Sequence, residues 1–268
     1  MLVPSPVMRR RQLVEIEDLP WCPRPVRDGG TDWLGFMANT TKAFSPVAPR
    51  IRGAMDATGT SNVVDLCSGG GGPWLTLAPE LETSGPVSVQ LTDLYPNVEG
   101  FTDLRARSGE KLSFRATSVD ATDVPVELDG VRTMFNCFHH FPPELARAIL
   151  SDAVRKRRGI AIFEGVDSRL LPALAMPMQV PAVLLLTPFV RPFRWSRLFF
   201  TYVIPLIPLL VFFDGTMSMF RIYLADELRE MVASIPGHET FDWDIGSTPV
   251  KGAPIGLTHL VGIPKRDM

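Results

Sequence analysis

The run Asn62-Val-Val-Asp-Leu-Cys-Ser-Gly-Gly-Gly-Gly-Pro73 is the most informative segment of this 268-residue chain. A short apolar run stands directly before four consecutive glycines, and helical character resumes after Pro73. Glycine allows tight turns and lets a backbone approach a ligand closely, and the beginning of the following helix favours polar or anionic groups. The segment therefore predicts a strand, a tight loop that contacts a ligand, and a helix.

The rest of the chain repeats this alternation of strand and helix. Four further strands are predicted, set apart by helical or helix-length segments, at 87–93, 112–119, 131–136 and 159–164. Strands that alternate with helices in this way form a mostly parallel, doubly wound sheet. Two closing segments, 239–245 and 257–263, are predicted to be strands that end the sheet as an antiparallel edge. The fold class is therefore α/β.

Composition excludes several classes of protein. Lys and Arg (27) nearly balance Asp and Glu (29), so there is no bulk positive charge to hold nucleic acid. The cysteines Cys22, Cys67 and Cys137 lie far apart and there are only four histidines, so neither a disulfide framework nor a structural zinc site is supported. The N-terminal residues have no apolar segment after their arginines, which argues against a secretory signal. We expect a cytoplasmic protein.

The glycine pattern distinguishes between kinds of nucleotide site. A dinucleotide site needs a third glycine or alanine for close packing of helix on strand, but Gly69-x-Gly71 is followed three residues later by Trp74. Leu75 stands at the corresponding position after Gly70-x-Gly72. A nicotinamide or flavin cofactor is therefore disfavoured. No Gly-Lys-Ser/Thr follows the loop, which excludes a P-loop.

Acidic residues stand at the ends of three successive predicted strands. Asp65 precedes the glycines, Asp93 ends the second strand, and Asp120 lies in Val119-Asp120-Ala121 at the end of the third. Together with the glycine loop, these residues resemble the class I S-adenosylmethionine-dependent methyltransferases, over most of the chain from about Thr31 to the final strand. The position of Asp93, 22 residues after Gly71, is about that of a ribose-binding carboxylate in a mononucleotide-binding half.

The resemblance implies an organisation and a cofactor. A seven-stranded Rossmann-like methyltransferase domain would span 31–268, with an irregular, proline-rich arm over 1–30. The cofactor would be S-adenosylmethionine, bound by Asp65, Gly69, Gly71, Asp93, Asp120, Ala121 and Asn136. The backbone of the loop would cradle the methionine moiety, with Asp65 supporting its amino group or the loop. Asp93 would accept hydrogen bonds from the ribose hydroxyls, and Asp120 would bind the adenine amine beside Ala121. Cys67 stands where the family usually has its first glycine.

The acceptor side is predicted from the segment Asn136-Cys-Phe-His-His-Phe-Pro142, which follows the fourth strand. Open α/β sheets bind ligands at the carboxyl ends of their strands, so His139 and His140 are the candidate catalytic residues. Glu164, Arg221 and Tyr223 are candidate contacts to the acceptor. Methyl transfer from a sulfonium is an in-line displacement that depends chiefly on alignment, so a base is needed only when the acceptor must lose a proton.

An apolar insertion over 170–223 follows the fifth strand. The runs 170–190 and 198–213 carry no charge, and Arg191, Arg194 and Arg197 lie between them. A membrane-spanning hairpin is one interpretation, but prolines interrupt both runs and the second is shorter than the ~20 residues that a span needs. A second is interfacial attachment, in which the arginines face anionic headgroups and aromatic side chains enter the acyl boundary, namely Phe193, Trp195, Phe199 and Phe200. The third is a helical lid over the acceptor site.

The leading hypothesis is therefore a methyltransferase that uses S-adenosylmethionine and acts on a small molecule. The lid and the interfacial interpretation both imply a lipophilic acceptor, and the second implies peripheral membrane contact through 170–213. The alternative is a methyltransferase-like scaffold without activity that binds a membrane or a partner, which only Cys67 and the insertion support. The sequence does not choose among oxygen, nitrogen, sulfur and carbon as the acceptor atom.

Overall fold

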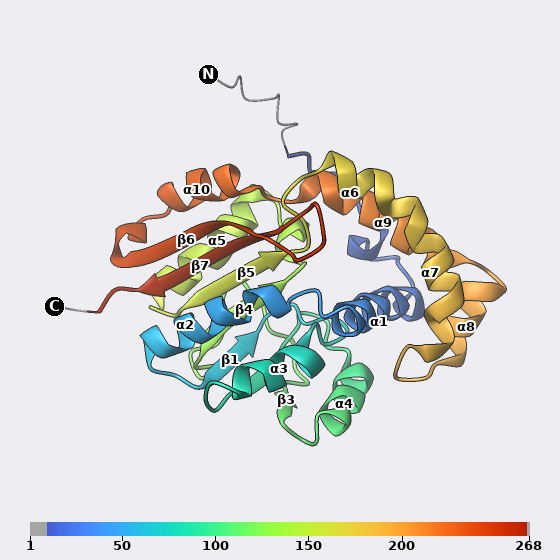
Figure 1. The fold of residues 1–268 in the computed structure, drawn as a ribbon, viewed down its shortest axis with the longest axis horizontal. Helices are drawn as coiled ribbons and strands as arrows, with labels where there is room; N and C mark the ends of the chain where they lie inside the picture. Colours follow the sequence, from blue (N-terminus) through green and yellow to red (C-terminus); the bar gives the residue numbers. More distant parts are fainter. Residues whose placement is uncertain (1–9, 267–268) are drawn as a thin grey trace.

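A single seven-stranded sheet organises the protein in the computed structural model, which describes residues 10–266 (Figure 1). The strand order is β3-β2-β1-β4-β5-β7-β6. The strands are β1 (Asn62–Asp65), β2 (Ser88–Leu91), β3 (Leu112–Phe114), β4 (Val131–Phe135), β5 (Ile160–Glu164), β6 (Phe241–Thr248) and β7 (Leu257–Pro264). The first five are mutually parallel, whereas β7 runs antiparallel between β5 and β6. The predicted α/β sheet and its antiparallel edge are confirmed.

Helices cover both faces of this sheet and bury two separate apolar clusters. Six of them belong to the sheet layers or flank them: α1 (Arg24–Thr40), α2 (Ala48–Thr58), α3 (Trp74–Glu82), α4 (Val98–Arg107), α5 (Pro143–Arg155) and α10 (Ala225–Ala233). One cluster contains residues of α5 and α10, such as Ile149 and Leu228, and the other contains residues of α2 and α3, such as Ile51 and Leu77. The sheet lies between the two clusters, as expected for a doubly wound fold.

The insertion after β5 is helical. Its helices are α6 (Leu170–Ala175), α7 (Gln179–Leu186), α8 (Trp195–Tyr202) and α9 (Leu206–Arg221), with 3-10 turns around α7. Helices α6, α7 and α8 all pack against α9, and α8 and α9 pack against α1. Figure 1 shows these helices gathered at one end of the molecule, away from β6 and α2. We refer to α6–α9 as the helical layer.

The N-terminal boundary differs from the expected one. Helix α1 begins at Arg24, within the segment 1–30 that was expected to be irregular, and Pro25 stands in its first turn, where a missing N–H costs nothing. Gly29 and Gly30 lie inside this helix because α9 approaches it there, and a Cβ on either glycine would collide with a side chain of α9. The irregular arm is therefore shorter than 1–30, and residues 1–9 of it lie outside the part that the structure describes.

The third strand is also shorter than predicted and ends at Phe114.

The side chain of Asn97 caps the beginning of helix α4, and a substitution there tests how much this cap contributes to stability. The Asn97 Oδ1 atom accepts a hydrogen bond from the Gly100 N–H at 3.1 Å, and its amide donates to Asp32 at 3.1 Å. We expect Asn97→Ala to lower the free energy of unfolding by about 1–2 kcal/mol, because a cap and a buried hydrogen bond are lost together. Urea unfolding of both proteins measures the difference. Asn97→Ser, which keeps a capping oxygen, should lose less, and equal losses would contradict the capping role.

Candidate functional site

The glycine loop after β1 has the backbone that close approach to a ligand needs. Gly69, Gly71 and Gly72 have φ values of 51°, 95° and 56°, in the left-handed region that glycine adopts without strain. Cys67 has a φ of 55°, so it takes the left-handed conformation expected of the glycine it replaces. A non-glycine residue in that conformation costs about 1–2 kcal/mol. The altered residue therefore leaves the turn in place at an energetic cost.

Asp65 supports the glycine loop through buried hydrogen bonds. It is 1% exposed, and its two carboxylate oxygens accept hydrogen bonds from the hydroxyls of Ser68 and Thr133, both at 2.7 Å. Burial raises the pKa of Asp65 to about 7, although these hydrogen bonds act in the opposite direction. Of the two roles that the sequence left open, the contacts favour support of the loop.

Two more acidic residues stand beside the loop at the ends of neighbouring segments. Asp93 is half-buried after β2, and it accepts hydrogen bonds from the Gly69 and Tyr95 N–H groups, both at 2.8 Å. Burial raises its pKa, against the effect of these backbone donors. Asp120 is exposed, and one of its oxygens accepts from the Thr122 N–H at 2.8 Å. Ala121 beside it is buried.

Helix α1 covers the outer side of the glycine loop, which the sequence did not indicate. A Cβ on Gly70 would collide with the backbone of Thr31, and one on Gly35 would lie 3.2 Å from the Gly70 carbonyl oxygen. The Asn39 amide donates to the Gly72 carbonyl at 2.8 Å. The loop is thus fixed between β1 and α1. No local signal in the sequence pairs residues of 31–39 with the loop, because the contact depends on how α1 packs.

His139 and Glu164 form a buried pair at the ends of β4 and β5. The His139 Nδ1 atom lies 2.7 Å from one Glu164 oxygen, and the His139 backbone N–H donates to the other at 3.1 Å. Because Nδ1 faces a carboxylate, the ring is held with its proton there and its lone pair on Nε2. This Nε2 is closed to solvent and has no hydrogen-bond partner among residues 10–266. Asn136 precedes the pair with a φ of 52°, and its side chain accepts from the Gly165 N–H at 3.1 Å.

The N-terminal arm brings carboxylates to His140. The His140 Nδ1 atom lies 2.9 Å from Asp18 and 3.1 Å from Glu15, and its Nε2 lies 3.4 Å from Glu17. Burial alone would lower the pKa of His140, but the hydrogen bond with Asp18 and the three negative charges outweigh it and raise the pKa to about 10. His140 is therefore positively charged near neutral pH, so it cannot serve as a general base. The sequence could not show this, because its partners lie more than a hundred residues away.

Two predicted acceptor contacts hold the histidine turn. The Arg221 guanidinium donates to the carbonyl of His140 at 2.6 Å and to Asp18 at 2.7 Å, and the Tyr223 hydroxyl donates to the Phe141 carbonyl at 2.9 Å. Both side chains are buried. These contacts show that both side chains position the turn, and that the oxygens of Glu164 face His139. The predicted contact of these three residues with an acceptor stays a prediction.

Three groups in this region have the spacing of metal ligands. One ligand atom each from Glu15, His139 and His140 lie within 4.8 Å of one another. They are close enough to hold one metal ion, a possibility the sequence missed because Glu15 comes from the arm. In the structure, Arg221 and His140 supply positive charge beside Glu15, at 3.3 Å and 3.1 Å. The contacts of Glu15 are thus accounted for by an ion-pair network.

The helical layer borders the site, and two of its arginines form ion pairs within the protein. Arg197 is 2% exposed and pairs with Asp32 of α1. Arg194 pairs with Asp32 at 3.2 Å and with Glu99 at 2.9 Å. Burial raises the pKa of Asp32 to about 6, with both arginines acting in the opposite direction. The prediction that these two arginines face lipid headgroups is wrong, because acidic partners on α1 and α4 bind them inside the protein.

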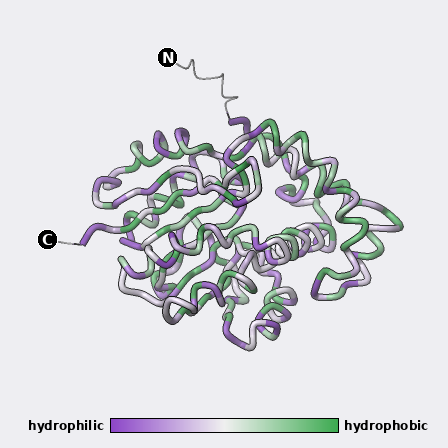
Figure 2. The backbone as a smooth tube through the Cα atoms, in the orientation of Figure 1, coloured by the Kyte–Doolittle hydropathy of each residue, from purple (hydrophilic) through white to green (hydrophobic). Residues whose placement is uncertain are grey.

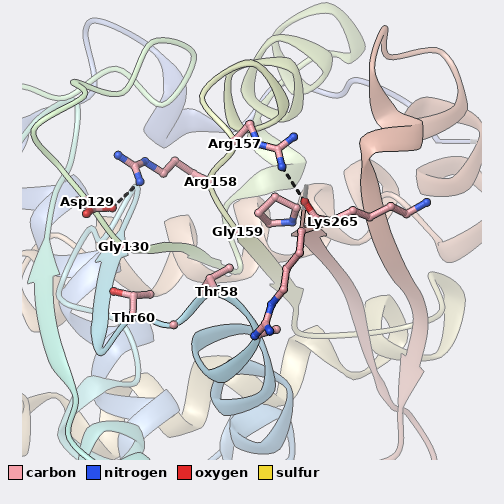
Figure 3. Close-up of a pocket in the computed structure, with 12 residues that line it drawn as sticks. Thr58, Thr60, Asp129, Gly130, Arg157, Arg158, Gly159 and Lys265 are labelled. Carbon is pink, nitrogen blue, oxygen red and sulfur yellow. Dashed lines mark hydrogen bonds and ion pairs between the residues drawn. The ribbon is translucent and has the colours of Figure 1, made fainter. Parts of the chain in front are cut away.

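A cavity lies away from these residues, at the opposite ends of the strands (Figure 3). It has a volume of about 530 Å³ and is lined by residues such as Thr58, Thr60, Gly130 and Gly159. Figure 3 shows Arg158 turned toward Asp129, with which it forms an ion pair at 2.6 Å. Parallel sheets bind ligands at the carboxyl ends of their strands. The site around the glycine loop is therefore the better candidate, despite this cavity.

Comparison with known proteins supports the fold. No family model matches the chain, and no curated protein matches it. Among solved structures, it is similar to an O-methyltransferase family protein from Burkholderia thailandensis, with 13% identity and a TM-score of 0.50 over 86% of this chain and 59% of that one. It is also similar to the methyltransferase domain of bacterial CtHen1, with 11% identity and a TM-score of 0.50 over 82% of this chain and 99% of that one.

Other matches have the same character. Human N-acetylserotonin methyltransferase is 15% identical, with a TM-score of 0.49 over 96% of this chain and 63% of that one. The chain spans 48% of the methyltransferase domain of the citrinin polyketide synthase and 59% of the Burkholderia protein, about half to three-fifths of their lengths. At these identities the likeness concerns the fold alone. The chain has the fold of a class I S-adenosylmethionine-dependent methyltransferase.

Proposed function

We propose that this protein is a cytoplasmic methyltransferase that uses S-adenosylmethionine and transfers its methyl group in line to a small, lipophilic acceptor. The observation that carries the proposal is that the glycine loop, Asp93 and Asp120 all follow parallel strands, with Asp93 bonded to the loop and the Val119 N–H, next to Asp120, bonded to the Asp93 carbonyl. A fold alone does not imply a function, so the argument rests on whether these groups suit the cofactor.

The groups present suit S-adenosylmethionine. Each oxygen of Asp93 accepts one backbone N–H, which leaves acceptor capacity for two ribose hydroxyls, because a carboxylate offers about four lone-pair sites. Asp120 is exposed, and among residues 10–266 only one of its oxygens accepts a hydrogen bond, so the other is available to an adenine amine. Gly69 and Gly71 supply the left-handed backbone of a tight loop that would cradle the methionine moiety. Cationic sulfonium chemistry also agrees with three carboxylates on one edge of the sheet.

On the acceptor side, we propose that His139 is the catalytic residue. Its Nδ1 is committed to Glu164, and its Nε2 carries the lone pair that can take a proton from an acceptor. His140 and Arg221 are positioning residues, which fix the turn that carries His139. Since Nε2 is closed to solvent, acceptor entry requires movement of the arm or of the helical layer.

The proposed acceptor is lipophilic because the helical layer borders the histidine turn. Helix α9 contacts both the turn at Phe138–His140 and the arm at Ile16–Asp18. Apolar side chains form most of α7 and of the first half of α9. A pocket that opens along this layer would be lined mainly by apolar groups, which favours acceptors with little charge.

Binding of S-adenosylhomocysteine tests the proposal against the scaffold hypothesis. Isothermal titration of the full chain should give a Kd in the micromolar range, with NAD as the matched control that shows no binding. Incubation with isotope-labelled S-adenosylmethionine and a lipid extract should then yield a labelled product by mass spectrometry. Absence of S-adenosylhomocysteine binding in folded protein would reject the methyltransferase and favour the scaffold.

A further inference from the structure

The helical layer has an unusual distribution of polarity. Along the continuous segment Leu170–Phe189, exposed apolar side chains recur mostly at intervals of three, four or seven residues, which is the spacing of one helix face. These six side chains, which we call the outer stripe, are between 52% and 72% exposed: Leu170, Leu171, Leu174, Met178, Leu185 and Phe189. A helix on the surface of a soluble protein normally has charged residues on this face. The outer stripe therefore marks a face suited to an apolar environment. Figure 2 shows much of the backbone of the helical layer in the green of hydrophobic residues.

The neighbouring helices have the same inverted polarity. On α8, Trp195 is 78% exposed whereas Arg197 is 2% exposed. On α9, Leu209 is 56% exposed whereas Asp214 and Arg221 are buried. Charged groups thus point inward to partners within the protein, and large apolar groups point outward. Such an arrangement is expected where the surroundings are lipid and not water.

Charge indicates which apolar partner fits. The segment 170–213 contains no Asp or Glu, and Arg194 and Arg197 are taken up by internal ion pairs. Arg191 is the exposed cation of the segment. An interface with a protein partner ordinarily has a polar rim with paired charges. Contact with the neutral acyl region of a bilayer needs no charged residues. The exposed Trp195 and Tyr202 are residues that favour the membrane–water interface.

The geometry excludes a simple span. Leu170–Phe189 is long and apolar enough to cross a membrane, with only 17% of it buried. Helices α8 and α9 together are also long and apolar enough, but a bend of 77° separates them. However, Ile207 and Leu210 of α9 pack against Gly29 and Gly30 of α1. A spanning hairpin would have to leave these contacts and the ion pairs of the layer. The layer is therefore a part of the folded protein that exposes one side.

We propose that the outer stripe seats the protein on a lipid bilayer, with the helical layer lying in the plane of the interface and not crossing it. Attachment comes from insertion of apolar side chains into the acyl boundary and not from attraction between arginines and headgroups. The attachment extends the proposed function, because a lipophilic acceptor then reaches the site from the bilayer. In that one respect the proposal rests on the proposed function. The attachment itself needs neither cofactor nor methyl transfer.

Flotation of the full chain with phosphatidylcholine vesicles tests the attachment, without cofactor. We expect the protein to float with these neutral vesicles and with matched vesicles that contain phosphatidylserine. Raising the salt from about 0.1 M to about 1 M, which shortens the Debye length from about 10 Å to about 3 Å, should change the bound fraction little. Binding that needs phosphatidylserine and is lost in high salt would overturn attachment by insertion.

The outer stripe is tested with the triple variant Leu174→Gln, Leu185→Gln, Phe189→Gln. Loss of three inserted side chains should weaken partitioning at least about 100-fold, since one such side chain is worth roughly tenfold or more. The matched control is Val126→Gln with Leu145→Gln, two exposed apolar residues outside the layer, which should float like the wild type. S-adenosylhomocysteine binding and thermal unfolding check that both variants remain folded.

Three results would overturn the proposal: no flotation of the wild type, equal flotation of the triple variant, or equal loss in the control. Sedimentation of the protein without vesicles tests whether a second copy of the chain, instead of lipid, covers the outer stripe. A stable dimer that the triple variant dissociates, with no vesicle binding, would also overturn it. Failure of vesicle binding with intact S-adenosylhomocysteine binding rejects the attachment alone, and the converse result rejects the proposed function alone.

Discussion

Replacing His139 by alanine is expected to lower turnover roughly 10²–10⁴-fold while leaving S-adenosylhomocysteine affinity near that of the wild type. The Nε2 lone pair of His139 is the proton acceptor proposed for the transfer, and loss of a positioned general base has this magnitude. Release of S-adenosylhomocysteine with the acceptor found in the lipid screen measures turnover. The residues proposed for the ribose and the adenine, Asp93 and Asp120, follow β2 and β3, so cofactor binding should change little in this variant.

Glu164→Gln provides the matched comparison for this experiment. Glutamine keeps an oxygen to accept the His139 Nδ1 proton but lacks the charge that holds the ring in its orientation. We expect a smaller loss of turnover than in His139→Ala. If His139→Ala retains full turnover, the pair is structural and the transfer proceeds by alignment alone.

Replacing Asp93 by alanine is expected to weaken S-adenosylhomocysteine binding roughly 10- to 150-fold. A hydrogen bond to a charged group contributes about 1.5–3 kcal/mol, and Asp93 is the proposed partner of the ribose hydroxyls. Isothermal titration measures the change. The same carboxylate accepts the Gly69 N–H, so some of the loss would come from a loosened glycine loop.

Asp93→Asn separates these two contributions. Asparagine keeps one oxygen, which can still accept the Gly69 N–H and hold the loop, but it removes the charge, the acceptor of the Tyr95 N–H and one ribose acceptor. An intermediate affinity, with thermal stability near the wild type, would assign the main loss to the ribose contact. Unchanged affinity in folded Asp93→Ala would reject this residue as a cofactor ligand, whatever the state of the loop.

The sheet could be predicted because its signals are local. The run from Val63 to Gly72 fixes a strand and a left-handed loop through residues adjacent in the chain, and the structure has both. The approximate positions of the other strands followed from short apolar segments, although β3 proved shorter than expected. The helical insertion was expected for the same reason, as two long uncharged runs stand out in any context.

The acceptor side could be predicted only in part. His139 was located by its place after β4, and its tautomer became evident only through Glu164, 25 residues later. His140 was assigned as a base equal to His139, but three carboxylates of the arm make it a cation. No pattern in the sequence links Glu15, Glu17 and Asp18 to a turn more than a hundred residues away, because that contact exists only in the packed fold.

The sequence by itself determined the strand–loop–helix around the four glycines, the alternation that builds the sheet, and the apolar character of 170–213. Tertiary structure alone decided which face of that insertion is exposed and where its arginines point. Helical periodicity shows that a stripe of apolar residues exists, but not whether it meets the core or the surroundings. That choice is made by partners such as Asp32, which draws Arg197 inside and leaves the leucines of the outer stripe on the surface.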